Sequence, residues 1–189
     1  MDGKATNSRW GDKKRIVIVG VILVLLISSI IFFLSSKYSK PSGKILYVNT
    51  NGSGDFNCDG IDDQVEINQA LADVAENPEF IAVYLRGPNT YVISDSIYIG
   101  SNTILEGDST AVIKLKDKAG WKEEKPLITQ MDSAGNQDIT IKGFEIDGNH
   151  DNNSDKSNGK GYYNLMYFVN SQNIKVHDMY MHDSHGDGL

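Results

Sequence analysis

The first strong pattern in the sequence is an uninterrupted apolar run. Residues 16–34 read IVIVGVILVLLISSIIFFL, a stretch of 19 residues without a charge. A helix of that length, rising about 1.5 Å per residue, nearly crosses the roughly 30 Å hydrocarbon layer of a membrane. The preceding tail, residues 1–15, is basic, and basic residues favour the cytoplasmic side. The pattern predicts one transmembrane helix with a cytoplasmic N-terminus, then a polar linker over residues 35–43 and an extracellular remainder.

A cleavable signal peptide is the main alternative for this segment. The apolar run is longer than the usual signal-peptide core of about 7–15 residues, and no A-x-A cleavage site follows it. A surface that is apolar all round, with basic residues before it, also suits lipid better than the core of a domain. We therefore favour an uncleaved anchor.

A mixed pattern of apolar stretches and polar turns begins after the linker. Residues Ile45–Val48 form a strand candidate, and a loop rich in Gly, Asn and Asp follows over residues 49–62. Asp63 and Glu66 have the spacing of a capping box, which predicts the start of a helix. The apolar positions of this helix recur at helical spacing until Asn77-Pro78 ends the pattern: Val65, Ile67, Ala70, Leu71 and Val74.

Past the helix the pattern changes to short strands separated by Gly and Asn turns. The expected strands are Ile81–Leu85, Tyr91–Ile93, Ile97–Ile99, Thr103–Leu105, Val112–Leu115, Leu127–Gln130 and Leu165–Phe168. The polar stretch from Asp147 to Asn164 interrupts them and is expected to be an insertion at one turn.

Two later segments repeat one another at a spacing of 35 residues. The alignment pairs Ile139 with Ile174, Ile141 with Val176, Phe144 with Met179 and Ile146 with Met181. An upstream segment fits the same frame, with Gly107 over Gly143. Three short strands per repeat predict an all-β fold in which stacked coils form a parallel β-helix. A β-sandwich is the alternative, but it would need two-residue hairpin turns, and the links here are longer.

Charge and cysteine content limit the function classes. Residues 1–40 carry +5, so the total of -7 leaves -12 for residues 41–189. This acidity argues against nucleic acid as a partner, because phosphate binding needs clustered Lys and Arg. The single cysteine, Cys58, excludes an internal disulfide and a cysteine-rich zinc site.

The segment GDFNCDGIDDQVEINQAL, residues 54–71, resembles the opening segment of right-handed parallel β-helix proteins of the pectate lyase and polygalacturonase type. A wider resemblance, over residues 45–189, is to the disaggregatase-type proteins of methanogenic archaea. The stretches YVNTNGSGDFNCDGIDDQ, ITIKGFEIDGN and GKGYYNLMYF carry it. The resemblance implies a right-handed parallel β-helix with a capping α-helix, and an activity that degrades a uronate-containing matrix polysaccharide.

Two features depart from that family. Its members are usually secreted or wall-associated, whereas this chain has a predicted anchor. The sequence also stops at Leu189, where the family pattern would begin another strand. We therefore expect residues 44–189 to be an incomplete N-terminal part of the β-helix domain, with little activity by itself.

Imidazole and carboxylate groups are densest near the end of the chain. The repeat places His182 over Asp147 in the next coil, and stacked coils lie about 4.8 Å apart. Such groups suit polysaccharide cleavage, because hydrolysis needs an acid and a base, and a lyase needs a base for the proton beside the uronic carboxylate. The candidate catalytic residues are Asp147, His182, Asp183 and Asp187. The structural alternative is that these residues only form turns.

The loop before the helix has the spelling of a calcium-binding loop. Asp55, Asn57, Asp59 and Glu66 fall at positions 1, 3, 5 and 12 of an EF-hand pattern. Calcium is thus the candidate cofactor. Against this interpretation, no helix is evident before Asp55, and Glu66 has a competing use in the capping box. A turn leading into the helix is the alternative.

The expected partners are the membrane, through residues 16–34, and an acidic polysaccharide. The candidate substrate-binding residues are Tyr162, Tyr163, Lys160 and His177. Flat aromatic faces can stack on sugar rings, and cations can hold uronate carboxylates. The leading hypothesis is a membrane-tethered extracellular enzyme that degrades a uronate-containing glycan. The alternatives are a non-catalytic surface module that binds carbohydrate or acts as a spacer, and an inactive remnant. The sequence leaves the oligomeric state open.

Overall fold

The computed structural model describes residues 43–122, 124–153 and 162–189. The predicted tail, the membrane helix, residues 35–42 of the linker and Lys160 lie outside the described residues. In the described ranges no helix is long and apolar enough to cross a membrane. The membrane anchor therefore stays a prediction.

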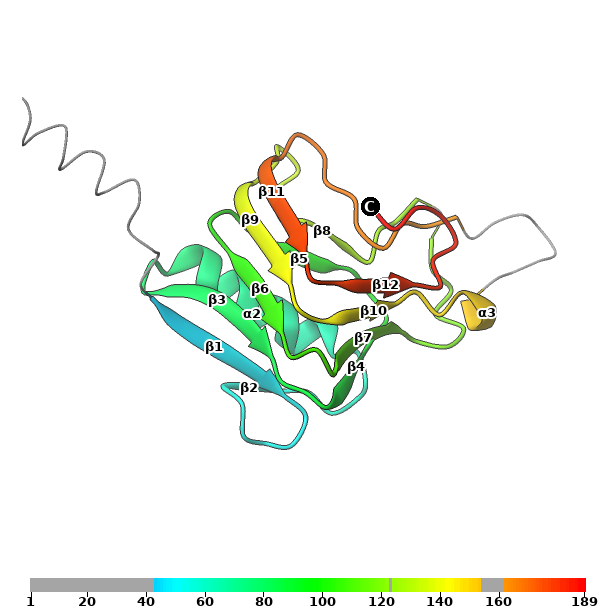
Figure 1. Cartoon of the computed structure of the whole chain (residues 1–189), viewed down its shortest axis with the longest axis horizontal. Coiled ribbons are helices and arrows are strands. Elements are labelled where there is room, and N and C mark those ends of the chain that lie inside the picture. Colours follow the sequence, from blue (N-terminus) through cyan, green and yellow to red (C-terminus); the bar gives the residue numbers. More distant parts are fainter. Residues whose placement is uncertain (1–42, 123, 154–161) are drawn as a thin grey trace, which may run out of the picture. The chain divides into compact units, whose positions relative to one another are not determined.

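Short strands build the described part of the chain (Figure 1). Their bounds are β1 Lys44–Asn49, β2 Phe56–Asn57, β3 Phe80–Leu85, β4 Asn89–Ile93, β5 Ile97–Ile99, β6 Ile104–Gly107, β7 Ala111–Leu115, β8 Ile128–Gln130, β9 Gln137–Lys142, β10 Glu145–Asp147, β11 Gln172–His177 and β12 Tyr180–His182. The first sheet has the order β11-β9-β6-β3-β1-β2, the second has the order β12-β10-β7-β4, and the third pairs β5 with β8.

All of these pairings are parallel, and the chain visits the sheets in turn. From β3 onward one coil therefore adds a strand to the first sheet and then a strand to the second. The described chain is mostly β and has a β-helix-like fold, as the repeat predicted.

The predicted register is confirmed at the pairs that the strands contain. Ile139 pairs with Ile174 and Ile141 with Val176 between β9 and β11, while Ile146 pairs with Met181 between β10 and β12. The upstream spacing of 36 residues also holds, since Leu105 pairs with Ile141. The predicted strands therefore stack in the expected frame.

The core lies between the sheets and follows the alternation along each strand. Ile139, Ile141 and Ile146 are fully buried, because coils lie on both sides of them. Ile174 and Val176 are only half-buried and pack against the core from β11, the outermost strand of the first sheet in the described chain.

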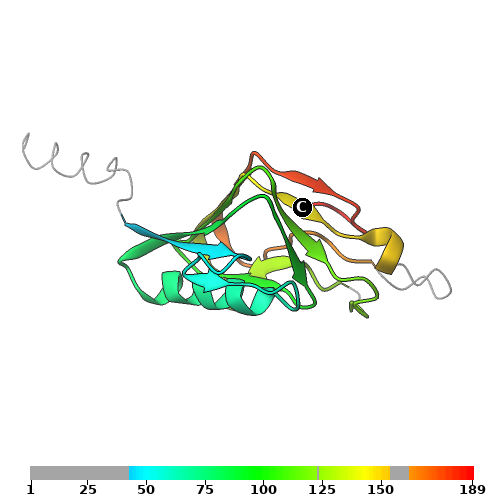
Figure 2. The same ribbon diagram turned by 90° about the horizontal axis from the view of Figure 1, so that it is seen from below.

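Helix α2, Gln64–Glu76, packs against β3 and β5 and covers that side of the early coils (Figure 2). Its own residues Ile67, Ala70 and Leu71 are fully buried and belong to the core. The predicted capping box is wrong, because the Asp63 side chain makes no cap hydrogen bond to the helix. Val65 is also exposed, at 47%, rather than part of the apolar face.

Two strands also differ from the expectation. The expected strand Leu165–Phe168 is reduced to a single parallel bridge between Ile128 and Met166. The two-residue strand β2 was not expected. The polar insertion begins with a short helix, α3 His150–Asn153, and the coil is described again from residue 162.

Short polar residues make the corners that lead into the first sheet. Asn102, Asp138 and Asn173 occupy equivalent positions one coil apart, and each has a positive φ of 55–59°. Asn and Asp tolerate this left-handed conformation better than most residues do. The Asn173 amide also donates to the Asp138 carboxylate, so adjacent corners are linked.

Candidate functional site

The candidate catalytic residues lie mainly where β10 and β12 end side by side. Asp147 and His182 are in register between these strands, as predicted, and Asp183 follows directly. Each of the three offers an oxygen or nitrogen atom within 4.8 Å of those of the other two. We call these residues, together with Glu145 and Lys114, the His182 cluster.

His182 lies between two carboxylates. Its Nδ1 is 2.9 Å from Asp183 Oδ2, and its Nε2 is 3.1 Å from Glu145 Oε1. Burial lowers the pKa of His182, but the hydrogen bonds with Asp183 and Glu145 and the negative charge of nearby Asp147 and Asp183 outweigh it. The net effect raises the pKa of His182 above the ordinary histidine value.

Asp147 is nearly buried, with 8% of its surface exposed. Its carboxylate forms an ion pair with Lys114, the residue in register on β7, and accepts a 2.7 Å hydrogen bond from the backbone of Asn149. Lys114, Asp147 and His182 thus form one column across three coils. Asp147 has little access to a polymer in the solvent.

Sequence reasoning missed both Glu145 and Lys114. Glu145 could have been found, since it lies two residues before Asp147 on the same strand and therefore on the same face. Lys114 was harder to find because its partner Asp147 is 33 residues away rather than 35 or 36. The change in coil length concealed the pairing.

Asp187 belongs to a different contact. Its carboxylate Oδ2 lies 3.2 Å from the hydroxyl of Tyr162, which donates to it, and its backbone N–H donates to Asn164. The hydrogen bond with Asp187 and its negative charge raise the pKa of Tyr162. Asp187 is not among the groups that the described chain brings together around His182.

The two adjacent tyrosines have opposite environments. Tyr162 is 45% exposed, whereas Tyr163 is fully buried and donates a 2.6 Å hydrogen bond to the backbone oxygen of Gly148. Burial, with the negative charges of Asp147 and Asp183, raises the pKa of Tyr163 to about 12. The expectation that Tyr163 offers a face to sugar is therefore wrong, because its ring is part of the core.

His177 lies on another sheet, at the end of β11. Its Nδ1 is 2.7 Å from Asp178 Oδ2, and the residue in register on β9 is Lys142. His177 is exposed, and it lies on a different sheet from the His182 cluster.

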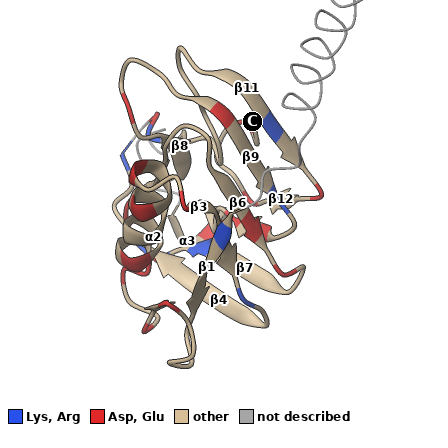
Figure 3. Cartoon of the chain, turned by 90° about the vertical axis from the view of Figure 1, so that its left-hand side faces the viewer, with Lys and Arg blue, Asp and Glu red and all other residues tan. Residues whose placement is uncertain are grey.

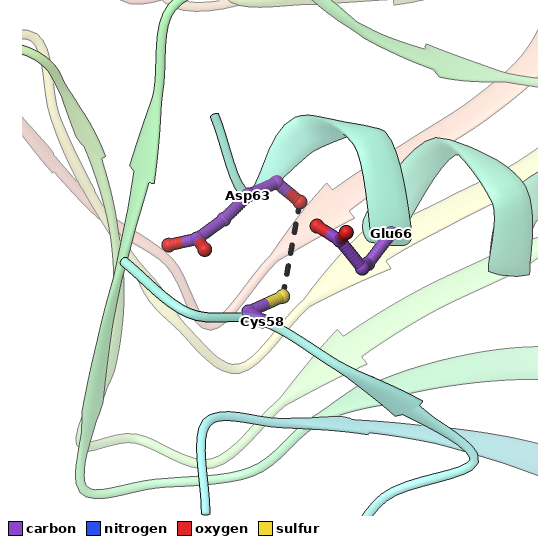
Figure 4. A group of neighbouring side chains, drawn as sticks. All are labelled: Cys58, Asp63 and Glu66. Carbon is purple, nitrogen blue, oxygen red and sulfur yellow. Dashed lines mark hydrogen bonds between the residues drawn. The ribbon is translucent and has the colours of Figure 1, made fainter. Parts of the chain in front are cut away.

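The loop residues predicted to bind calcium are engaged in local turns. Asp55 accepts a hydrogen bond from the backbone of Tyr47, Asn57 exchanges hydrogen bonds with Gly54, and Asp59 accepts one from the backbone of Ile61. Glu66 instead lies near Cys58 and Asp63 (Figure 4). Calcium binding by this loop stays a prediction.

The group formed by Cys58, Asp63 and Glu66 has a structural explanation. Burial, followed by the charges of Asp63 and Glu66, raises the pKa of the Cys58 thiol far above its usual range, so the thiol stays protonated. The Asp63 carboxylate accepts hydrogen bonds from the backbones of Gly60 and Val92, at 2.8 and 2.7 Å. It therefore ties the loop to β4 instead of capping α2.

An aromatic and cationic surface lies beside the insertion. Lys125 Nζ is 4.6 Å from the centre of the Trp121 ring, and the backbone of Glu124 donates a 2.8 Å hydrogen bond to the backbone oxygen of Tyr162. Trp121 is partly exposed, and Lys122 is exposed beside it. We call Trp121, Lys122, Lys125 and Tyr162 the Trp121 surface. Tyr162 joins it through the backbone hydrogen bond of Glu124, while its ring lies against Gly186 and its hydroxyl donates to Asp187. Elsewhere acidic residues are prominent, for example along α2 (Figure 3).

The parallel sheets, which the chain visits in turn, define a β-helix-like protein. No family model matches the chain, and no curated protein matches it. Among solved structures, it is similar to PfbA, a surface adhesin of Streptococcus pneumoniae, with 20% sequence identity and a TM-score of 0.52. The match covers 71% of this chain and 33% of that chain, so this chain spans about a third of the length of PfbA. At this identity the likeness shows the fold alone, and closeness to the disaggregatase type is not shown.

Proposed function

We propose that this chain is a surface-displayed, right-handed β-helix protein, tethered through residues 16–34, that binds an acidic, uronate-containing polysaccharide. The observation that carries the proposal is the Trp121 surface. It combines two aromatic side chains with two lysines in a domain that is otherwise strongly acidic. The fold shared with a surface adhesin supports display at the cell surface.

The chemistry of the Trp121 surface fits a uronate polymer. Sugar rings have apolar C–H faces that pack on aromatic rings, and their carboxylates attract lysine. Lys125 already pairs with Asp95 and lies over Trp121, so it is held in place at the surface. Tyr162 adds a second aromatic side chain with 45% of its surface exposed.

Binding can be measured by titrating the full chain with polygalacturonate, with neutral dextran as the comparison polymer. Tyr162→Ala and Lys125→Gln should each weaken binding roughly fivefold, the effect of about 1 kcal/mol. Tyr167→Ala is the matched control, because Tyr167 is 52% exposed but belongs to another surface.

The proposal fails if Tyr162→Ala and Lys125→Gln bind as the wild type does, or if Tyr167→Ala loses as much affinity as they do. Equal affinity for dextran and polygalacturonate would remove the uronate specificity. A protein that binds neither polymer would favour the inactive remnant.

Cleavage of the same polymer is the second candidate function. The observation in its favour is the imidazole of His182, which lies within 3.1 Å of two carboxylates. Such a pair can give one proton to a glycosidic oxygen and accept another from water or from the carbon beside a uronate carboxylate. This candidate is the weaker one. Asp147 is nearly buried, and His177 lies on a different sheet from His182.

Assays of reducing ends and of the ultraviolet absorbance of unsaturated uronates test for hydrolysis and elimination, respectively. Asp183→Asn should lower either rate by at least about 100-fold if the His182 cluster is catalytic, whereas Asp178→Asn should not. Binding without release of fragments would leave the non-catalytic function alone.

A further inference from the structure

Two His-Asp dipeptides, five residues apart in sequence, provide an internal comparison. His177 is the last residue of β11 in the first sheet, and His182 is the last residue of β12 in the second. In both, the His Nδ1 lies close to an oxygen of the next Asp, at 2.7 and 2.9 Å. Both aspartates also have a positive φ, 56° for Asp178 and 52° for Asp183. The local geometry of the two dipeptides is thus nearly the same.

The neighbouring coil distinguishes them. His177 is in register with Lys142, whereas His182 is in register with Asp147. The ammonium group of Lys142, which pairs with Glu106, offers no ligand atom to a metal at His177. The Asp147 carboxylate, which also pairs with Lys114, offers a third ligand atom beside His182. Asp147, His182 and Asp183 each offer such an atom within 4.8 Å of the others, and no such group in the described chain includes His177.

The surroundings of His182 also match those of metal-bound histidines. Such a histidine usually has its second ring nitrogen held by a carboxylate. Glu145 Oε1, 3.1 Å from Nε2, can hold the second nitrogen in this way when Nδ1 is the ligand. The cluster has three carboxylates, from Glu145, Asp147 and Asp183, and one lysine, Lys114, so a divalent cation would offset the excess negative charge.

We infer that Asp147, His182 and Asp183 bind a divalent transition-metal ion, such as Zn²⁺ or Mn²⁺, that links β10 to the segment after β12. One nitrogen and two carboxylate oxygens suit these ions, whereas calcium prefers oxygen ligands alone. His185, two residues after Asp183, lies against the ring of His150 and is not one of these three ligands.

A bound metal would have a structural role and would change the choice between functions. It would fasten the last described coil to the one before it. A metal on Nδ1 uses the one lone pair of the neutral ring and leaves Nε2–H paired with Glu145, so a metal-bound His182 cannot accept a proton as a general base. Metal binding would thus exclude His182 as the base of a cleavage reaction without involving the Trp121 surface.

The test measures binding of Zn²⁺, Mn²⁺ and Ca²⁺, each added alone, to the metal-free full chain by calorimetry and thermal unfolding. Zn²⁺ or Mn²⁺ should raise the melting temperature by about 5 °C, and Ca²⁺ should do so less. His182→Ala and Asp183→Asn should weaken transition-metal binding at least tenfold, and Glu145→Gln by about tenfold. The matched controls His177→Ala and Asp178→Asn should bind as the wild type does.

Asp183→Asn keeps the test decisive if His182→Ala misfolds, because the Asp183 side chain is 64% exposed. The inference is overturned if the wild type binds neither Zn²⁺ nor Mn²⁺. It is equally overturned if the controls lose binding as much as Asp183→Asn does, since the metal would then bind to scattered surface histidines.

Discussion

Replacing Ile141 by alanine tests the stacking of the coils most directly. Ile141 is fully buried and in register with Leu105 on one side and Val176 on the other. The change removes three carbon groups, each worth about 0.8 kcal/mol on transfer from water. The cavity left between two coils adds to this loss, so the free energy of unfolding should fall by about 3–4 kcal/mol.

Ile174→Ala is the matched control for Ile141→Ala. It removes the same atoms one coil away, but Ile174 is only half-buried, on the outermost described strand of its sheet. Its loss should be about 1–2 kcal/mol, below the usual range for a fully buried isoleucine. The structure thus distinguishes two positions that the repeat alone makes equivalent.

Urea-induced unfolding of the full chain, followed by circular dichroism, measures both losses. The midpoints can be compared directly if the slopes of the transitions are equal. Equal losses within about 0.5 kcal/mol, or a larger loss for Ile174→Ala, would contradict the burial that this stacking assigns to the two positions.

Three other predictions concern topology, calcium and pH. In intact cells a cysteine at Ser42→Cys should react with an impermeant thiol reagent and one at Ala5→Cys should not; the reverse labelling would overturn the predicted orientation. Calcium should bind the loop only at about millimolar concentration, because Asp55 and Asp59 must give up backbone hydrogen bonds, and Asp59→Asn should abolish its effect on the melting temperature. Burial raises the pKa of Asp95, but Lys125 and the backbone of Ser96 outweigh it and hold the pKa below its ordinary value. The folded state therefore gains stability above about pH 4 that is lost as the pH falls through the lowered pKa, so Asp95→Asn should show a flatter dependence of melting temperature on acidic pH; identical curves would refute this contribution.

The repeat made much of the fold predictable. Apolar positions 35 residues apart, such as Ile139 and Ile174, must lie in one column when coils of nearly equal length stack. The start of α2 was less predictable. The spacing of Asp63 and Glu66 indicates a capping box. In the structure, however, the Asp63 carboxylate accepts a hydrogen bond from the backbone N–H of Val92, 29 residues away. A local pattern cannot show such a competing partner.

The candidate site was predictable only in part, for a similar reason. The alternation of a strand tells which residues point the same way, but not how deeply the neighbouring segment covers them. Tyr162 and Tyr163 are neighbouring residues of the same type. Tyr162 is exposed, whereas Tyr163 lies in the core beside Trp121. Only the path of the chain after the insertion separates them.

In a stacked fold, the chemistry of a residue depends on its column as much as on its sequence neighbours. His177-Asp178 and His182-Asp183 have the same sequence and nearly the same local geometry. Their neighbours one coil away, Lys142 and Asp147, carry opposite charges. Two unit charges about 5 Å apart interact by roughly 3 kcal/mol at an effective dielectric constant near 20. Because Lys142 pairs with Glu106 and Asp147 pairs with Lys114, part of that difference is offset, and what separates the two columns is that only the His182 column adds a carboxylate oxygen as a ligand atom.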